Sequence, residues 1–220
     1  MHHTRHATKE AARHQFERWA PSYDRSILQR VVFQPSYRAF LTEVVRWRLA
    51  DPAPFDALDV GCGTGTWCGM LANAALPARR VVGLDYSHTM CRHAAEKTRR
   101  GEGQPLPFIH GDAEHLPFTD HSFDLLTCSN SFHHYPHQAA VVREFHRVLR
   151  PGGRLMIIDG FRDNLIGWIA FDVFVTRAEG RVYHAPASVM RQYFREAGFR
   201  TISQRKFGVL VPLFVTVGAV

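Results

Sequence analysis

The chain is poor in cysteine and contains no long apolar run. Its 220 residues include four cysteines, none of them paired as C-x-x-C, and no secretory signal precedes them. We therefore expect free thiols in a reducing cytoplasm rather than a disulfide framework. No stretch reaches the roughly 18 consecutive apolar residues of a membrane-spanning helix, so no membrane span is expected.

A dense basic block is also missing, although the formal net charge is +7. No basic block is longer than the pairs Arg79-Arg80 and Arg99-Arg100, and the other arginines are scattered along the chain. Proteins that bind nucleic acid or a membrane surface usually carry a concentrated basic patch. We therefore do not expect nucleic acid as the partner. We expect a small-molecule substrate instead. The oligomeric state stays open between a monomer and a homodimer.

Strand and helix patterns alternate from residue 55 onward, without an internal repeat or low-complexity segment. Such alternation predicts a parallel sheet with helices on both faces. The last two strands are joined by only Phe207-Gly208 and should form an antiparallel hairpin. The expected fold is α/β: a Rossmann-like, seven-stranded, mostly parallel sheet with an antiparallel final strand. Strands are predicted at residues 57–60, 80–85, 106–110, 123–128, 154–159, 201–206 and 209–217, and helices at 66–75, 88–99, 138–149 and 187–197.

Helical patterns also precede the sheet. Residues 8–20 and 26–49 are predicted to be helical, with a break near Pro35. We expect residues 1–54 to form a helical N-terminal lid or substrate-side extension, and residues 55–220 to form the main domain. Its helical insertion at 161–183 is rich in apolar side chains, which suit a substrate wall as well as packing on the core or on a second subunit.

Three glycines at alternate positions follow the first predicted strand. Gly61, Gly63 and Gly65 separate this strand from a predicted helix, an arrangement typical of nucleotide-type binding sites. Glycine accepts a positive φ and lets a ligand approach the main chain closely. A dinucleotide fingerprint, G-x-G-x-x-G, needs its third glycine one residue later. The spacing therefore favours another ligand.

An acidic residue ends the second predicted strand, at the sheet edge where the glycines lie. Asp85 follows the first glycine by about 20 residues, a position suited to the two hydroxyls of a ribose. Ser87 is placed to cap the next helix, so capping does not by itself account for Asp85.

The segments after the third and fourth strands add to the same edge. Asp112 and the backbone amide of Ala113 suit the amine and a ring nitrogen of an adenine, and Leu116 suits its flat face. Residues 129–136 form a polar and aromatic lip.

Together these segments make the chain resemble the class I S-adenosylmethionine (SAM)-dependent methyltransferases. Within that class the chain is similar to the ubiquinone/menaquinone-biosynthesis C-methyltransferase-like group, which carries the methyltransferase type 11 domain. The resemblance covers about residues 55–159 and rests on residues 58–65, 83–85, 111–118, 123–126 and 147–155, which occur in the right order at compatible spacing.

The resemblance implies that SAM is bound and released as S-adenosyl-L-homocysteine (SAH). The three glycines would approach its methionine and ribose parts, and Asp59 would act through its amino group or a water. Tyr23, in a segment similar to the family's N-terminal lid, would close over its carboxylate. The expected cofactor-binding residues are Tyr23, Asp59, Gly61, Cys62, Gly63, Gly65, Asp85, Tyr86, Asp112, Ala113 and Asn130; Cys62 is expected to be a small filler in the turn rather than a nucleophile.

The acceptor side is less defined. Methyl transfer from a sulfonium depends mainly on alignment, and a base is needed only where the nucleophile must lose a proton. His133 and His134 follow the fourth strand and are the candidate bases. No carboxylate follows that strand, so no metal is expected. The predicted activity is methyl transfer to an apolar or aromatic small molecule through an O, C or N acceptor, with Trp19, Phe132, Trp168 and Phe171 as expected substrate-binding residues.

Other classes fit less well. An NAD-dependent dehydrogenase would need the later glycine and a Tyr/Lys or His/Asp catalytic set. A base-modifying DNA enzyme would need prolines after the fourth strand, where the chain reads Ser129-Asn130-Ser131-Phe132. A SAM-dependent RNA methyltransferase and a non-catalytic SAM-binding regulatory protein would keep the same motifs, and both stay open as alternatives.

Overall fold

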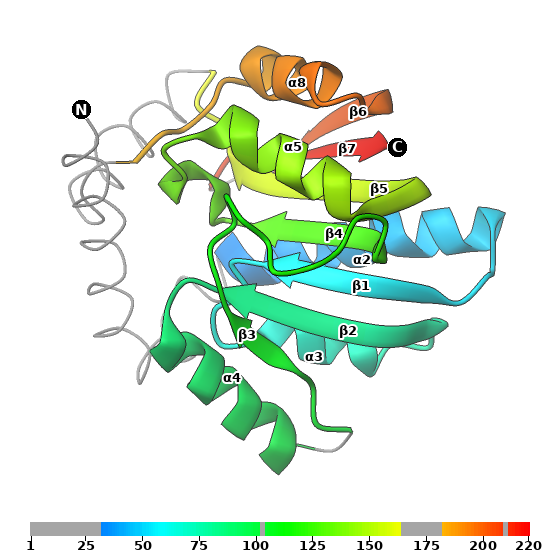
Figure 1. Cartoon of the computed structure of the whole chain (residues 1–220). Helices are drawn as coiled ribbons and strands as arrows, with labels where there is room; N and C mark the ends of the chain where they lie inside the picture. Colours follow the sequence, from blue (N-terminus) through cyan, green and yellow to red (C-terminus); the bar gives the residue numbers. More distant parts are fainter. Residues whose placement is uncertain (1–31, 102–103, 164–181, 209–210) are drawn as a thin grey trace.

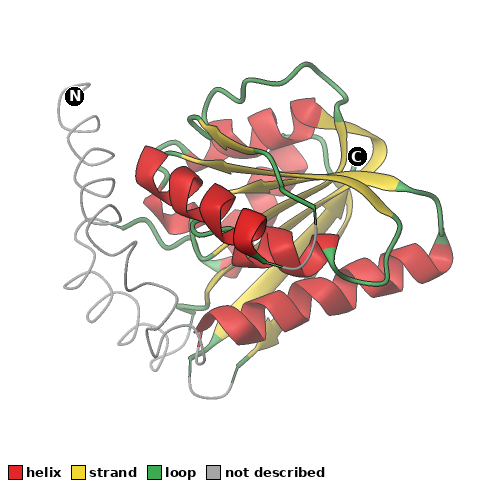
Figure 2. Cartoon of the chain, turned by 90° about the horizontal axis from the view of Figure 1, so that it is seen from below, coloured by secondary structure: helices red, strands yellow, loops and turns green. Residues whose placement is uncertain are grey.

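The computed structural model describes residues 32–101, 104–163, 182–208 and 211–220. They form one seven-stranded sheet with helices on both faces (Figures 1 and 2). The strands are β1 (Phe55–Val60), β2 (Ala78–Asp85), β3 (Phe108–His110), β4 (Phe123–Ser129), β5 (Leu149–Gly160), β6 (Arg200–Phe207) and β7 (Leu213–Ala219). The helices are α2 (Gln34–Ala50), α3 (Thr66–Ala72), α4 (His88–Arg100), α5 (Gln138–Val148) and α8 (Ala187–Glu196), with a short 3-10 helix at Phe132–His134.

The order of the strands confirms the predicted α/β fold. Across the sheet the order is β3-β2-β1-β4-β5-β7-β6, and β7 runs antiparallel to both β5 and β6. β1 pairs in parallel with β2 on one side and with β4 on the other, so the chain reverses its direction of travel across the sheet there. In open sheets of this kind, ligands bind at the carboxyl ends of the strands beside such a switch.

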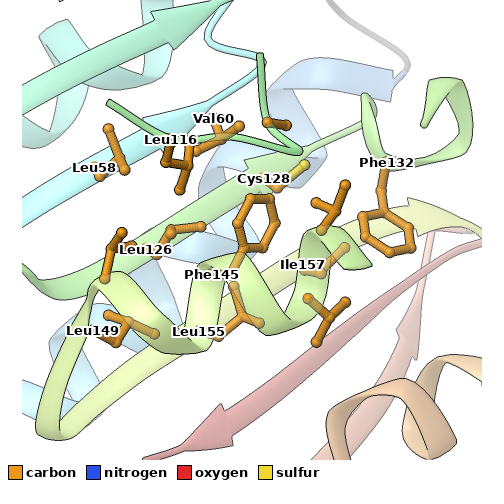
Figure 3. Packing of buried hydrophobic residues seen from close by; sticks show 14 of the residues in the cluster. Leu58, Val60, Leu116, Leu126, Cys128, Phe132, Phe145, Leu149, Leu155 and Ile157 are labelled. Atoms are coloured by element: carbon orange, nitrogen blue, oxygen red, sulfur yellow. The ribbon is translucent and has the colours of Figure 1, made fainter. Parts of the chain in front are cut away.

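Side chains of the central strands alternate between two packed faces of the sheet. Leu58 and Phe145 of α5 belong to the hydrophobic cluster on one face, part of which Figure 3 shows in close view. Its neighbour Ala57 packs on the opposite face with Phe40 of α2 and Trp67 of α3. The helices thus cover both faces and leave the ends of the strands to form the site.

The connection between β6 and β7 is longer than the sequence predicts. Phe207 pairs with Leu213, so residues 208–212 connect the two strands. The strands are antiparallel as predicted. The predictions of a two-residue connection and of a final strand that begins at residue 209 are wrong. Gly208 has a φ of +81°, and a Cβ there would overlap the carbonyl of Val211, so the chain turns sharply at this glycine.

β5 begins at Leu149, earlier than the predicted residue 154, and includes Pro151, Gly152 and Gly153. Leu149 pairs with Phe123, but the next pair joins Arg154 to Leu125. The residues between Leu149 and Arg154 therefore form a bulge within β5. On the other side of the sheet α3 ends at Ala72, short of the predicted residue 75.

α2 is the described part of the N-terminal region. It begins at Gln34, with Pro35 in its first turn, where the missing N–H is not needed. The predicted break near Pro35 also depends on residues 26–31, which lie outside the described residues, so it stays a prediction. Phe40, Val44 and Trp47 fix α2 to the sheet. The predicted helix at 8–20 and most of the insertion lie outside the described residues, and among the described ones no helix is long and apolar enough to cross a membrane.

Candidate cofactor site

A pocket of about 1000 Å³, counting its open mouth, lies at the carboxyl ends of β1, β2 and β4. This volume is typical of sites for small molecules and cofactors. Asp59, Asp85 and Asp112 all line it, whereas no lysine or arginine does among the described residues. A pyrophosphate would meet no cationic side chain there, while a ligand with a positive charge would meet three acidic side chains.

The glycine turn forms the pocket's floor at the end of β1. Gly61 and Gly63 line the pocket with φ values of +72° and +53°. A Cβ on Gly61 would overlap the side chain of Ser131 and lie 3.0 Å from the hydroxyl of Tyr135. Glycine is therefore required at this position both by the backbone conformation and by the neighbouring side chains.

Gly65 has a different place. It is the N-cap of α3, with a φ of +70°, and lies outside the residues that line the pocket. A Cβ there would lie 2.6 Å from the ring of Phe108 and 3.0 Å from Ala94. Gly65 thus allows α3 to begin close to β3 and α4. Its predicted contact with the cofactor stays a prediction.

Asp85 joins the glycine turn to the start of α4. One carboxylate oxygen accepts the N–H of Gly63 at 2.9 Å, and the other accepts the N–H of Ser87 at 2.8 Å. Burial raises the pKa of Asp85, and these two hydrogen bonds oppose that rise. Ser87 caps α4 itself by accepting the N–H of Met90. The carboxylate is held in one orientation, with lone pairs left for a ligand.

Asp112 and Ala113 lie in the loop after β3, beside Asp85, whose carbonyl accepts the N–H of Gly111 at 3.0 Å. Asp112 accepts the N–H of Glu114 at 3.0 Å through its side chain, which shapes the turn. Both residues line the pocket, as the sequence predicts for an adenine site, and so does Tyr86, which is predicted to bind the cofactor. Leu116 is buried in the hydrophobic core instead, and Met90 of α4, which the sequence does not single out, supplies an apolar wall.

Asp59 is the most deeply buried acid of the pocket, with only 4% of its surface exposed. It accepts the hydroxyl of Thr127 at 2.8 Å and the thiol of Cys68 at 3.6 Å. The indole N–H of Trp67 donates to the same Thr127 hydroxyl at 3.1 Å. Burial raises the pKa of Asp59 to about 7.

Cys62 also lines the pocket, but as a thiol. Its hydrogen bond with Cys68, together with burial, raises the pKa of Cys62 well above its ordinary value. A thiolate nucleophile is therefore disfavoured, and this agrees with its expected role as a filler.

On the β4 side of the pocket, the wall comes from β4 and α2. Asn130, at a φ of +50°, donates from its side chain to Ser36 of α2 at 3.0 Å and to Ser129 at 2.9 Å. Tyr37 lines the pocket one residue further along α2 and stacks on Trp67, with ring centroids 6.3 Å apart. Phe33 lines it as well. The sequence does not predict these α2 contacts, because they depend on how α2 packs rather than on a motif.

Three adjacent predicted site residues lie in the 3-10 helix after β4, and their side chains point in different directions. His134 lines the pocket. His133 is 6% exposed and turns to Asp159, whose carboxylate lies 2.7 Å from its Nδ1. Phe132 is fully buried in the core and does not line the pocket, and its predicted substrate contact stays a prediction. A three-residue turn points successive side chains in different directions. The predicted residues Trp19, Tyr23, Trp168 and Phe171 lie outside the described residues.

Comparison with known proteins agrees with this geometry. The profile of a family described as a methyltransferase domain matches residues 58–157. A demethylmenaquinone methyltransferase of Listeria welshimeri is 36% identical over 162 residues, which cover 73% of this chain and 67% of the relative. One from Bacillus cytotoxicus is 33% identical over 153 residues, which cover 70% of this chain and 63% of the relative. The chain belongs to the class I SAM-dependent methyltransferases.

A solved methyltransferase shares the whole fold. Magnesium protoporphyrin IX methyltransferase from Synechocystis, solved with bound SAH, superposes with a TM-score of 0.74 over 96% of this chain and 99% of its own, at 20% identity. SAM is the cofactor of this chain. The pocket's residues fit it: Gly61 leaves room that a side chain would fill, and the carboxylates complement a sulfonium and an ammonium group.

The raised pKa of Asp59 predicts that the ligand-free methyltransferase loses stability as the pH rises. Between the ordinary value of 3.8 and the folded value of about 7, the folded protein keeps a proton that the unfolded chain has released. The free energy of unfolding should therefore fall across this window, by on the order of 3 kcal/mol. Urea unfolding at about pH 5 and about pH 8 should show this fall in the wild type and a much smaller one in Asp59→Asn. Equal pH dependence in the two proteins would contradict the assignment.

Proposed function

We propose that this methyltransferase methylates a flat, apolar or aromatic small molecule that enters beside His134. The observation that carries the proposal is the composition of the pocket. Phe33, Tyr37, Trp67 and Tyr135 supply aromatic lining, and none of the described lining residues is a lysine or arginine that would favour a polyanion such as RNA. The relatives named for demethylmenaquinone support an acceptor with a quinone-type ring.

The chain's own part in the reaction is to bind and orient. SAM, when bound, supplies a methyl group on a positively charged sulfur. We assign its nucleoside end to Asp85, Asp112 and Ala113, and its methionine end to Asp59 and Asn130. An acceptor hydroxyl would donate a hydrogen bond to the imidazole of His134, which would take its proton as the methyl group transfers. An amine acceptor would need no such base.

A panel of acceptors tests the proposal. The purified chain is incubated with methyl-labelled SAM and, separately, with a reduced naphthoquinol, a substituted phenol, an aromatic amine and transfer RNA. We expect labelled product from the naphthoquinol or the phenol, identified by mass spectrometry. Label in RNA alone would favour the RNA methyltransferase. SAM binding without turnover on any acceptor would favour a regulatory protein.

His134→Ala is expected to lower kcat for a hydroxyl acceptor by roughly 100-fold or more, because general bases typically contribute about 10²–10⁴. The affinity for SAM, measured by calorimetry, should stay close to that of the wild type. His137→Ala is the matched control, since His137 lies three residues away, outside the pocket lining, and pairs with Glu114 at 3.0 Å. A kcat unchanged in His134→Ala would remove this residue from the mechanism.

A further inference from the structure

Three buried polar side chains gather behind the pocket wall, from three separate segments. His133 comes from the 3-10 helix after β4, Asp159 from the end of β5, and His184 from the stretch before α8. Their side chains are 8%, 6% and 1% exposed. One ligand atom from each lies within 4.8 Å of the others. Potential metal ligands are His, Cys, Asp and Glu side chains. Among the described residues, these three form the one group of such side chains that is close enough together to hold a metal ion.

The backbone around the cluster holds each side chain in place. Asp159 accepts the N–H of His133 at 2.9 Å and the N–H of Gly160 at 2.7 Å. The carbonyl of His133 accepts the N–H of Tyr183 at 2.7 Å, which places the adjacent His184. The convergence is therefore built into the main chain and does not depend on flexible side chains at a surface.

We propose that His133, Asp159 and His184 bind a divalent transition-metal ion, with Zn²⁺ the best match. Two imidazole nitrogens and one carboxylate oxygen are a common zinc ligand set. With bonds of about 2.0–2.2 Å, ligand atoms around a tetrahedral ion lie about 3.3–3.6 Å apart. The Nδ1 atoms of His133 and His184 lie 2.7 and 3.7 Å from the same oxygen of Asp159, on either side of that range.

Charge and burial favour the same ion. A carboxylate removed from water is costly unless a positive charge compensates it. A divalent ion supplies that charge and leaves both imidazoles neutral, as metal ligands are. The sequence predicts no metal because no carboxylate follows the fourth strand; Asp159 reaches the cluster from the fifth.

The ion has a structural role in this arrangement. It joins the ends of β4 and β5 to the segment before α8. The ring centroids of His133 and His134 lie 4.2 Å apart. His134 lines the pocket. The ion therefore stiffens the wall that carries His134 without contacting the acceptor.

Metal content tests the site directly. His2, His3 and His6 could hold an ion of their own, so the background protein is the full chain with all three replaced by glutamine. It is loaded with Zn²⁺, desalted and analysed for zinc by mass spectrometry. We expect about one ion per chain in the background and in the control His137→Gln, and at least about tenfold less in His184→Gln. Zn²⁺ should also raise the Tm of the background but not of His184→Gln.

A folded background chain that retains no zinc would overturn the proposal and leave a hydrogen-bonded Asp–His cluster. Folding is judged from circular dichroism and from SAM binding, so failure of the metal site is distinguishable from failure of the cofactor site. If His184→Gln does not fold, Asp159→Asn takes its place. Co²⁺ added to the background should give the visible absorption of a tetrahedral N/O site, and absence of that absorption would also overturn the proposal.

Discussion

Gly61→Ala is expected to bind SAM at least about 100-fold more weakly than the wild type, equivalent to about 2.7 kcal/mol. The added Cβ would overlap the side chain of Ser131 and crowd the hydroxyl of Tyr135, and both residues line the pocket. Relief of that overlap requires Ser131 to move, and the cofactor's space changes with it. Calorimetric titration of SAM into the two proteins measures the effect.

Gly152→Ala is the matched control for backbone strain. Gly152 has a φ of +81°, close to the +72° of Gly61, but no atom lies within 4 Å of its would-be Cβ. Both variants therefore carry a similar conformational cost of roughly 1 kcal/mol, and only Gly61→Ala should lose affinity. Adding Ser131→Gly to Gly61→Ala should recover part of the loss. Equal affinity in folded Gly61→Ala and Gly152→Ala would show that the glycine turn is not at the cofactor.

Asp85→Ala is expected to weaken SAM binding by a similar or larger factor. Charge-assisted hydrogen bonds contribute about 1.5–3 kcal/mol each, and a ribose can donate two to this carboxylate. The substitution also removes the acceptor for the N–H groups of Gly63 and Ser87. Asp85→Asn keeps one acceptor oxygen and should lose less affinity. The control is Asp120→Ala, which removes a 65% exposed carboxylate paired with Arg147.

Affinity within about twofold of the wild type in folded Asp85→Ala would contradict the ribose assignment, because even one hydrogen bond to a charged group exceeds that difference. Thermal unfolding of Asp85→Ala checks the fold separately. Asp85 also ties the glycine turn to α4, so some loss of stability is expected beside the loss of affinity.

The parts of the site that follow from local patterns could be predicted from the sequence. The positions of Gly61, Asp85 and Asp112 follow from strand periodicity and from the rule that parallel strands end at one edge. The pocket lining includes all three. The alternating glycines suggest equal roles, yet Gly65 serves the packing of α3, because its neighbours belong to β3 and α4.

The remaining parts depend on tertiary packing that no short pattern encodes. His133 and His134 are adjacent and chemically identical, and only the direction of the 3-10 turn assigns one to Asp159 and the other to the pocket. Tyr37 reaches the site because α2 packs beside α3, and His184 meets His133 across about 50 residues of chain. Such contacts need the folded arrangement to be known.

Calorimetric titration of the wild-type chain with SAM, and separately with NAD⁺, tests the central claim most directly. The carboxylate-lined pocket predicts one-to-one binding of SAM, competed by SAH, and no binding of NAD⁺, whose pyrophosphate would face Asp59, Asp85 and Asp112. Binding of NAD⁺, or no binding of SAM to the folded chain, would contradict the account.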